Sequence, residues 1–318
     1  MQEILVEAIL IAAFATGVGV LSSMTGIGGG TVNTPLLIII FGLSAQIAPA
    51  SALVAALFVA VASSASYWRQ NPRPTIPRVG LLLAVTTVPG SLLGVAMRTL
   101  ISDDMVLRVI FGVSLIPVAL KMLFAKRKTR GDLASEIAAF DMNSITRKRW
   151  AVSLIGAFIG GISAGLLGIG GGAVVVPVLS ILVGLPMHAA VATSMFTMMF
   201  TASSGTIMNY LSGHIDPFYA ISLGLGMLVG GQIGSKLACR VNAVQIKWIF
   251  GIVLVLPLVK MMSLGQMWLD PTDSSFLMAT LGDILIWLMI VLPIGLFRLY
   301  QIRQSQTVVD EEPCETPG

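Results

Sequence analysis

The chain has 318 residues, of which 56% are hydrophobic and only 11% are charged. Soluble domains carry about 25% charged residues, so this chain has too few charges to cover a water-exposed surface. With a mean hydropathy of +0.92, the composition excludes a cytosolic enzyme and a disordered chain, and it predicts a multispanning membrane protein. The two cysteines, Cys239 and Cys314, are too few for a disulfide-stabilised secreted scaffold.

Apolar stretches long enough to cross a membrane recur along the whole chain. A helix needs roughly 20 apolar residues to span about 30 Å of hydrocarbon. Two apolar runs, 35–43 and 174–184, are too short and are expected to be half-helices or re-entrant segments enclosed by protein. The first long segment carries Glu3 and Glu7 but no basic residue, so we expect an uncleaved helix rather than a signal peptide. The long segments are 4–23, 46–68, 78–98, 104–124, 150–167, 187–210, 217–238, 244–263 and 276–297.

The two halves of the chain resemble each other. The sequence Gly-Ile-Gly-Gly-Gly occurs at 26–30 and again at 168–172, and each copy is followed by a proline five residues later. The order and nearly constant spacing of further matches predict a duplication, in which each half has five segments and the second segment is short. These matches are Ala48 with Ala190, Ser51 with Thr193, Gly90 with Gly230, Gly94 with Gly234, and Phe111-Gly112 with Phe250-Gly251.

An odd number of segments per half inserts the second copy upside down. With the N-terminus outside, 16 of the 19 Lys and Arg face the cytoplasm, and the exceptions are Arg98, Arg108 and Lys260. Parallel copies with the N-terminus inside would place only 12 there, so the charge rule favours inverted repeats. The fold class is therefore an all-α polytopic membrane protein with two inverted repeats, as in many secondary transporters. The expected parts are the first repeat (1–124), a basic cytoplasmic loop (125–149), the second repeat (150–263), an extra helix (276–297) and a cytoplasmic tail (298–318).

Each glycine run is expected to interrupt a helix, because glycine costs about 1 kcal/mol relative to alanine in a helix interior. The proline that follows suits the first turn of a new helix, where its missing N–H matters least. The free N–H groups at such a helix start can bind an anion without Lys or Arg. Inverted repeats would bring both breaks together near the midplane. The alternative is that the glycines only permit close helix packing.

The candidate binding residues surround the two breaks. Thr31 and Asn33 follow the first break, whereas apolar residues follow the second. We therefore expect side chains from the first break and backbone from the second to contact the substrate. The complete candidate set is Gly26, Gly28, Gly29, Gly30, Thr31, Asn33, Gln46, Ser51, Gly168, Gly170, Gly171, Gly172, His188, Thr193 and Ser194.

Several of these candidates have a second interpretation. Gln46 and His188 open equivalent helices and are either ligands of a substrate oxygen or interfacial residues. The hydroxyls of Ser51, Thr193 and Ser194 either contact an anion or bond to their own helix backbone. The amides of two further residues are either substrate groups or ties between helices. They are Asn209 and Gln232.

The ordered motifs resemble the sulfite exporter TauE/SafE family over roughly residues 10–265. They are the paired Gly-x-Gly-Gly-Gly-x4-Pro, the run 188–194 at the start of a helix, the run 213–216, the Gly230 and Gly234 pair, and the run 247–251. The resemblance implies transport of small sulfur-containing anions, such as sulfite, thiosulfate or organosulfonates, across the bacterial inner membrane.

The expected function is therefore a secondary transporter that works by alternating access, with the C-terminus cytoplasmic. The alternatives are a passive anion channel and an intramembrane enzyme. We expect no enzyme, because Asp283 is the one acid more than a turn inside a predicted span and it lies outside the repeat. We also expect no cofactor. The expected partners are a small anion and the lipid bilayer but not nucleic acid. Coupling to protons or another ion and the oligomeric state stay open.

Overall fold

The computed structural model describes residues 2–101 and 145–238, with a few further residues between 103 and 110 and between 285 and 292. Among these residues every regular element is a helix. The predicted helices at 104–124, 244–263 and 276–297 lie wholly or largely outside the described residues, as do Asp283 and Lys260. The helices are α1 (Gln2–Thr25), α2 (Gly30–Ile39), α3 (Ile47–Trp68), α4 (Pro77–Leu100), α7 (Arg147–Leu167), α8 (Gly172–Pro177), η2 (Val178–Val183), α9 (Met187–Leu211) and α10 (Pro217–Leu237).

Five of these helices, α1, α3, α4, α7 and α10, are long and apolar enough to cross a membrane. Their apolar spans of 21–24 residues are about 32–36 Å long at 1.5 Å per residue, which covers the hydrocarbon core. Helix α9 is as long, with 25 residues, but its many Ser and Thr side chains lower its hydropathy. Large apolar side chains such as Val85, 72% exposed, and Ile155, 62% exposed, face outward. The prediction of a polytopic helical membrane protein is confirmed.

The short helices begin earlier than the proline rule predicts. Helix α2 begins at Gly30 and holds Pro35 in its interior, and α8 begins at Gly172 and ends at Pro177. The prediction that these prolines occupy a first helical turn is therefore wrong. The preceding glycine already ends the break, so the new helix forms at once and tolerates the loss of one backbone donor. In the second copy the chain passes into the wider π-helix η2 directly after the proline.

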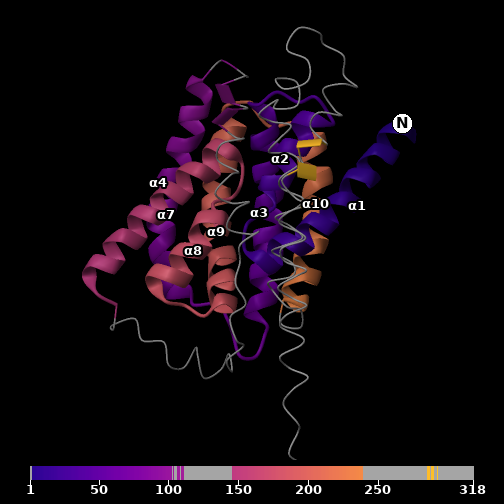
Figure 1. The fold of residues 1–318 in the computed structure, drawn as a ribbon. Helices are drawn as coiled ribbons and strands as arrows, with labels where there is room; N and C mark the ends of the chain where they lie inside the picture. The colour runs from indigo at the N-terminus through magenta and orange to yellow at the C-terminus, as the bar shows by residue number, and fades with distance from the viewer. Residues whose placement is uncertain are drawn as a thin grey trace, which may run out of the picture.

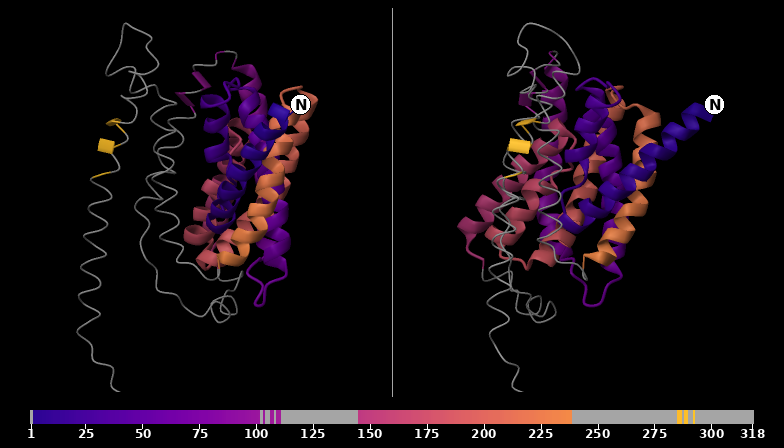
Figure 2. Two further views of the ribbon diagram at one scale, coloured as in Figure 1. Left: turned by 90° about the vertical axis from the view of Figure 1, so that its right-hand side faces the viewer. Right: turned by 45° about the vertical axis from the view of Figure 1, so that its right-hand side comes forward.

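Helices α1 and α10 are parallel and in close contact (Figure 1). Gly230 and Gly234 of α10 lie against the backbone of Thr16 and Val20 of α1. Residue numbers rise together along the two helices, so both run in the same direction. The N-terminal end of α1 leans away from the other helices (Figure 2). Helix α3 packs along the other side of α10 and completes the first group of three helices, α1, α3 and α10.

Helices α4 and α7 form an equivalent parallel pair. Gly161 and Gly165 of α7 lie against the backbone of Thr87 and Ser91 of α4. Helix α9 packs along α4 and completes the second group, α4, α7 and α9. The first group therefore has the first and second long helices of the first half and the third long helix of the second half. The second group has the reverse composition, and the same kinds of contact recur in both.

The two groups meet along α3 and α9, which are equivalent in the repeat (Figure 1). A Cβ at Gly205 of α9 would meet Leu53 of α3, and Ala56 and Met198 both lie beside Gly170. Residue numbers therefore fall along α9 as they rise along α3, and the two helices are antiparallel. These two helices, one from each half of the chain, thus run in opposite directions.

Candidate functional site

The two glycine runs end α1 and α7 and separate them from the short helices, as the sequence predicts. Three glycines in each run have φ between 69° and 98°, a backbone region that side chains disfavour and glycine adopts freely. The three occupy the same places in the two copies. They are Gly26, Gly28 and Gly29 in the first break and Gly168, Gly170 and Gly171 in the second.

The two breaks cross each other in direct contact at the centre of the protein. A Cβ on Gly30 would overlap the carbonyl oxygen of Gly168, and a Cβ on Gly172 would overlap the carbonyl oxygen of Gly26. The contact is reciprocal, because the last glycine of each run lies against the first glycine of the other run. Close packing of backbone therefore explains the glycines at 30 and 172, whatever else the breaks do.

Helix ends of opposite partial charge meet at this crossing. The N-terminus of α2 lies against the C-terminus of α7, and the N-terminus of α8 lies against the C-terminus of α1. Hydroxyl groups bind the exposed carbonyls, since Thr34 Oγ1 donates to the carbonyl of Leu167 and Ser194 Oγ donates to that of Gly26, both at 3.2 Å. The N-terminus of α2 has no side-chain cap at Gly29. Its first N–H groups therefore lack a side-chain acceptor.

Methionine side chains fill the space beside the breaks. A Cβ at Gly28 or at Gly170 would lie 2.5 Å from the Sδ of Met198, whose side chain is 1% exposed. The residue equivalent to Met198 in the first half is Ala56, so one long flexible side chain closes the centre from one side. Methionine changes rotamer easily, so a ligand can displace the Met198 side chain from this position.

Three side chains around the first break carry polar atoms that have no hydrogen-bond partner. Both amide atoms of Asn33, the hydroxyl of Thr31 and the hydroxyl of Ser22 are buried and unpaired. Asn33 and Ser22 are 0% exposed and Thr31 is 1% exposed. More than about 90% of buried polar groups are paired in proteins, and an unpaired one costs about 1–3 kcal/mol, so each of these atoms is a candidate contact for a polar ligand.

The hydroxyls of Ser51 and Thr193 instead hold the starts of two long helices. Ser51 Oγ accepts from the backbone N–H of Asp216, and Thr193 Oγ1 accepts from that of Ile76, each at 3.1 Å. Asp216 and Ile76 are the residues that precede α10 and α4. The two hydrogen bonds are equivalent in the repeat, so they position helices in both halves alike.

Gln46 and His188 lie at opposite ends of the helix bundle, because α3 and α9 are antiparallel. Gln46 donates from Nε2 to the carbonyls of Arg98, at 3.0 Å, and Ile101, at 2.7 Å. The ring of His188 lies edge-on to that of Tyr67, with 5.6 Å between centroids. The structure therefore places neither residue in the crossing of the breaks, where the sequence argument grouped them.

Arg98 is the residue that the sequence argument missed. The charge count assigned it to the outer surface, but its side chain is 0% exposed at the end of α4. It donates from Nη1 to the carbonyl of Gly165 at 3.3 Å and from Nη2 to Oδ1 of Asn209. A single arginine at a helix end is usually a topology marker, so only the structure reveals that this one points inward.

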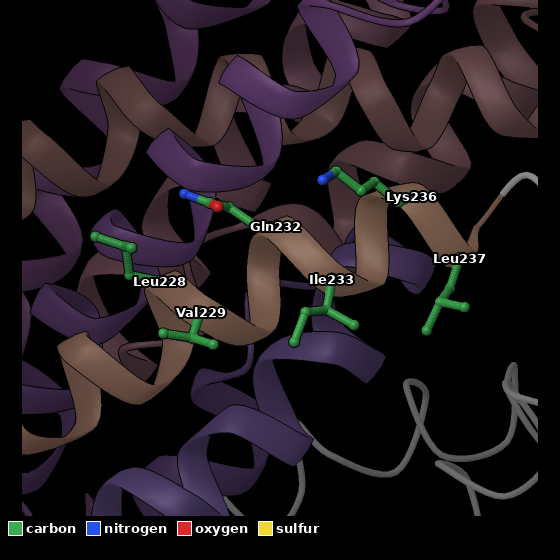
Figure 3. Close-up of a pocket in the computed structure, with 6 residues that line it drawn as sticks. All are labelled: Leu228, Val229, Gln232, Ile233, Lys236 and Leu237. Carbon is green, nitrogen blue, oxygen red and sulfur yellow. The ribbon is translucent and has the colours of Figure 1, made fainter.

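A pocket of about 350 Å³ lies away from the glycine breaks, along the surface of α10. Figure 3 shows Gln232 and Lys236 projecting to one side of the helix, while Ile233 and Leu237 project to another. Gln232 therefore does not tie the described helices together. No residue of either glycine break lines this pocket, and we assign it no role. Its lining residues are Leu228, Val229, Gln232, Ile233, Lys236 and Leu237.

The described residues contain no group of three or more His, Cys, Asp or Glu side chains that could hold a metal ion. The chemistry of the centre therefore rests on neutral donors and acceptors, together with backbone at the helix ends. Such a site suits reversible binding of a small polar or anionic molecule, since it offers donors without a fixed counter-charge.

Comparison with known proteins gives one family and several relatives. The family model described as Sulfite exporter TauE/SafE matches residues 9–261. The probable membrane transporter protein YunE of Bacillus subtilis is 28% identical over 75% of this chain and 91% of its own length. Probable membrane transporter proteins of Haemophilus influenzae, 27% identical over 67% of this chain and 76% of its own length, and of Methanocaldococcus jannaschii, 26% identical over 71% and 82%, also match. No solved structure matches.

Proposed function

The chain belongs to the sulfite exporter TauE/SafE family, and we propose that it is a secondary transporter that carries small oxyanions by alternating access. Its curated relatives are named as membrane transporters, and the chain itself is a multi-pass membrane protein. The single observation that carries the proposal is Asn33, a fully buried amide beside a helix break with both polar atoms unpaired.

In this proposal the anion binds at the first break. Asn33 Nδ2, the hydroxyl of Thr31 and the hydroxyl of Ser22 donate to its oxygens, and the N–H groups at the start of α2 add partial positive charge. Asn33 Oδ1 accepts from a protonated anion or from a water that enters with it. The second break contributes backbone at the crossing, and Met198 moves aside as the ligand enters.

Sulfur-containing oxyanions, such as sulfite, thiosulfate or organosulfonates, are the proposed substrates. The description of the family names sulfite export, and tetrahedral or pyramidal oxyanions present several acceptor oxygens to convergent donors. We place the protein in the bacterial inner membrane with its N-terminus outside. The opposite directions of equivalent helices support two repeats inserted in opposite senses, which is the architecture on which many secondary transporters rely.

Alternating access would arise from movement of one helix group against the other. Different contacts cross between the groups at the two ends. At one end Gln46, before α3, bonds the carbonyls of Arg98 and Ile101 at the end of α4. At the other end two rings of α3 pack on two rings of α9, in the pairs Tyr67 with His188 and Trp68 with Phe196. Opening one end would separate its contacts and keep those of the other end, so the centre would become accessible from one side at a time.

Uptake by proteoliposomes tests this function. Purified protein is reconstituted, and entry of radiolabelled thiosulfate is measured with unlabelled sulfite, organosulfonates and carboxylates as competitors. We expect saturable uptake that sulfur oxyanions inhibit more strongly than carboxylates do. Folded protein that gives no flux of any sulfur oxyanion would overturn the substrate class, and flux that never saturates would favour the channel.

A further inference from the structure

Arg98 carries a buried positive charge with no acidic partner among the described residues. Its side chain is 0% exposed, and its two hydrogen-bond partners, the Gly165 carbonyl and the Asn209 amide oxygen, are neutral. Arginine stays protonated in proteins, and an unpaired buried charge carries a large desolvation penalty. Among residues 2–101 and 145–238, no acidic side chain neutralises this charge.

Further unpaired polar atoms belong to residues that bond to Arg98 or to its partner Asn209. Arg98 Nε and Asn209 Nδ2 are buried donors without an acceptor, and Gln46 Oε1 and His214 Nδ1 are also unpaired. Gln46 donates from Nε2 to the Arg98 carbonyl, and the backbone N–H of His214 donates to the Asn209 carbonyl. Burial, followed by the positive charge of Arg98, lowers the pKa of His214. We call these four residues, Arg98, Asn209, Gln46 and His214, the Arg98 cluster.

The simplest structural role of Arg98 is to cap the C-terminus of α7 through the Gly165 carbonyl. The opposite end of the molecule shows that this role needs no charge. There, Tyr67 Oη donates to the carbonyl of Ser23, near the end of α1, at 2.8 Å. By the repeat, Ser23 is equivalent to Gly165 and Tyr67 to Asn209, whereas the residue equivalent to Arg98 is Ala238. The fold therefore closes a helix end without an arginine, and the charge is an addition at one end only.

We propose that the Arg98 cluster binds a small oxyanion, at a second site distinct from the first glycine break. The anion accepts from Arg98 Nε–H and Asn209 Nδ2–H, the two buried donors that have no acceptor, and the guanidinium supplies the positive charge that an oxyanion requires. In the proposed orientation this site lies at the outer end of the transport path, and the position equivalent to Arg98 in the second half is Ala238. Gly165 is one helical turn before the second break, so an anion held there stands next to the centre.

The number of anions bound per chain distinguishes the Arg98 site from the proposed site at the first glycine break. Binding of radiolabelled thiosulfate to the full-length protein in detergent is measured by equilibrium dialysis, and we expect two anions per chain. Arg98→Gln and Asn33→Leu should each bind one. Lys236→Gln, which removes an exposed charge of α10, is the matched control and should bind two.

Arg98→Lys and Asn209→Leu keep the positive charge and provide the test if Arg98→Gln does not fold. Both should weaken one of the two binding events at least tenfold, because lysine lacks the Nε–H donor of arginine and leucine lacks the amide. Two anions bound to Arg98→Gln with unchanged affinities, or unchanged affinities in both substitute variants, would overturn the Arg98 site. One anion in the wild type that is lost in Arg98→Gln and kept in Asn33→Leu would instead support this site and contradict the proposed central one.

Discussion

Replacing Asn33 with leucine separates a binding role from a structural role by the sign of the stability change. Leucine has the same number and branching of side-chain heavy atoms as asparagine. It is larger because two methyl groups replace the oxygen and the NH₂ group, and it has no polar atom. In the free protein the exchange removes two buried unpaired atoms, each of which costs about 1–3 kcal/mol. The loss of these penalties, less some strain from the added volume, should stabilise the free protein by about 1–3 kcal/mol. The apparent Tm in detergent should rise by a few degrees.

The same substitution should weaken anion binding. A hydrogen bond to a charged group contributes about 1.5–3 kcal/mol, and each 1.4 kcal/mol is a factor of ten. Loss of the Nδ2 donor should therefore raise the Kd for thiosulfate at the central site by about 10–150-fold. Thermal unfolding and equilibrium binding, measured on the same preparation, give both quantities.

Thr34→Val is the matched control, because Thr34 is the next residue of α2 and its hydroxyl is already paired with the Leu167 carbonyl. It should lower stability by about 0.5–1.5 kcal/mol and leave the Kd unchanged. The binding role of Asn33 is refuted if Asn33→Leu lowers the Tm while the Kd stays at the wild-type value.

Three other substitutions test the architecture. Gly30→Ala should prevent folding, because its Cβ would overlap the backbone of the second break, whereas Gly17→Ala, which meets nothing within 4 Å, should keep or slightly raise the Tm; normal yield of Gly30→Ala would contradict the crossing. Gly42 and Gly184 are exposed, equivalent in the repeat and expected at opposite ends of the helix bundle. In a background without native cysteines, Gly42→Cys should react with an impermeant maleimide in whole cells, whereas Gly184→Cys should react only after permeabilisation. Labelling of both cysteines from one side would exclude inverted repeats. Ser51→Ala should lower stability by about 1 kcal/mol through loss of its bond to the Asp216 N–H, with binding affinity within twofold; a tenfold weaker affinity would return Ser51 to the anion site.

The long helices were predictable because membrane thickness sets a minimum apolar length that the sequence shows directly. The glycine breaks were predictable for the same kind of local reason, since four glycines in five residues do not sustain a helix. The start of α2 at Gly30 was not, because the preference of proline for a first turn is a tendency that packing of the break against Gly168 overrides.

The candidate site was predictable only in part. The sequence marks Asn33 and Thr31 as polar residues in an apolar segment, and the structure shows that their polar atoms are unpaired. The sequence alone does not show that the hydroxyls of Ser51 and Thr193 bond to the residues before α10 and α4, because those partners lie more than a hundred residues away in the chain. Burial of Arg98 is equally a property of tertiary packing, set by the contact of α4 with α7 and α9.

Counterflow in proteoliposomes tests the central claim of alternating-access oxyanion transport most directly. Vesicles are loaded with unlabelled thiosulfate and diluted into a trace of the labelled anion. The membrane potential is held at zero with valinomycin and equal potassium concentrations on both sides. We then predict a transient accumulation of label above its external concentration, which a channel cannot produce without a potential, and its loss in Asn33→Leu. Label that only equilibrates, or an accumulation that Asn33→Leu leaves intact, would contradict transport through the central site.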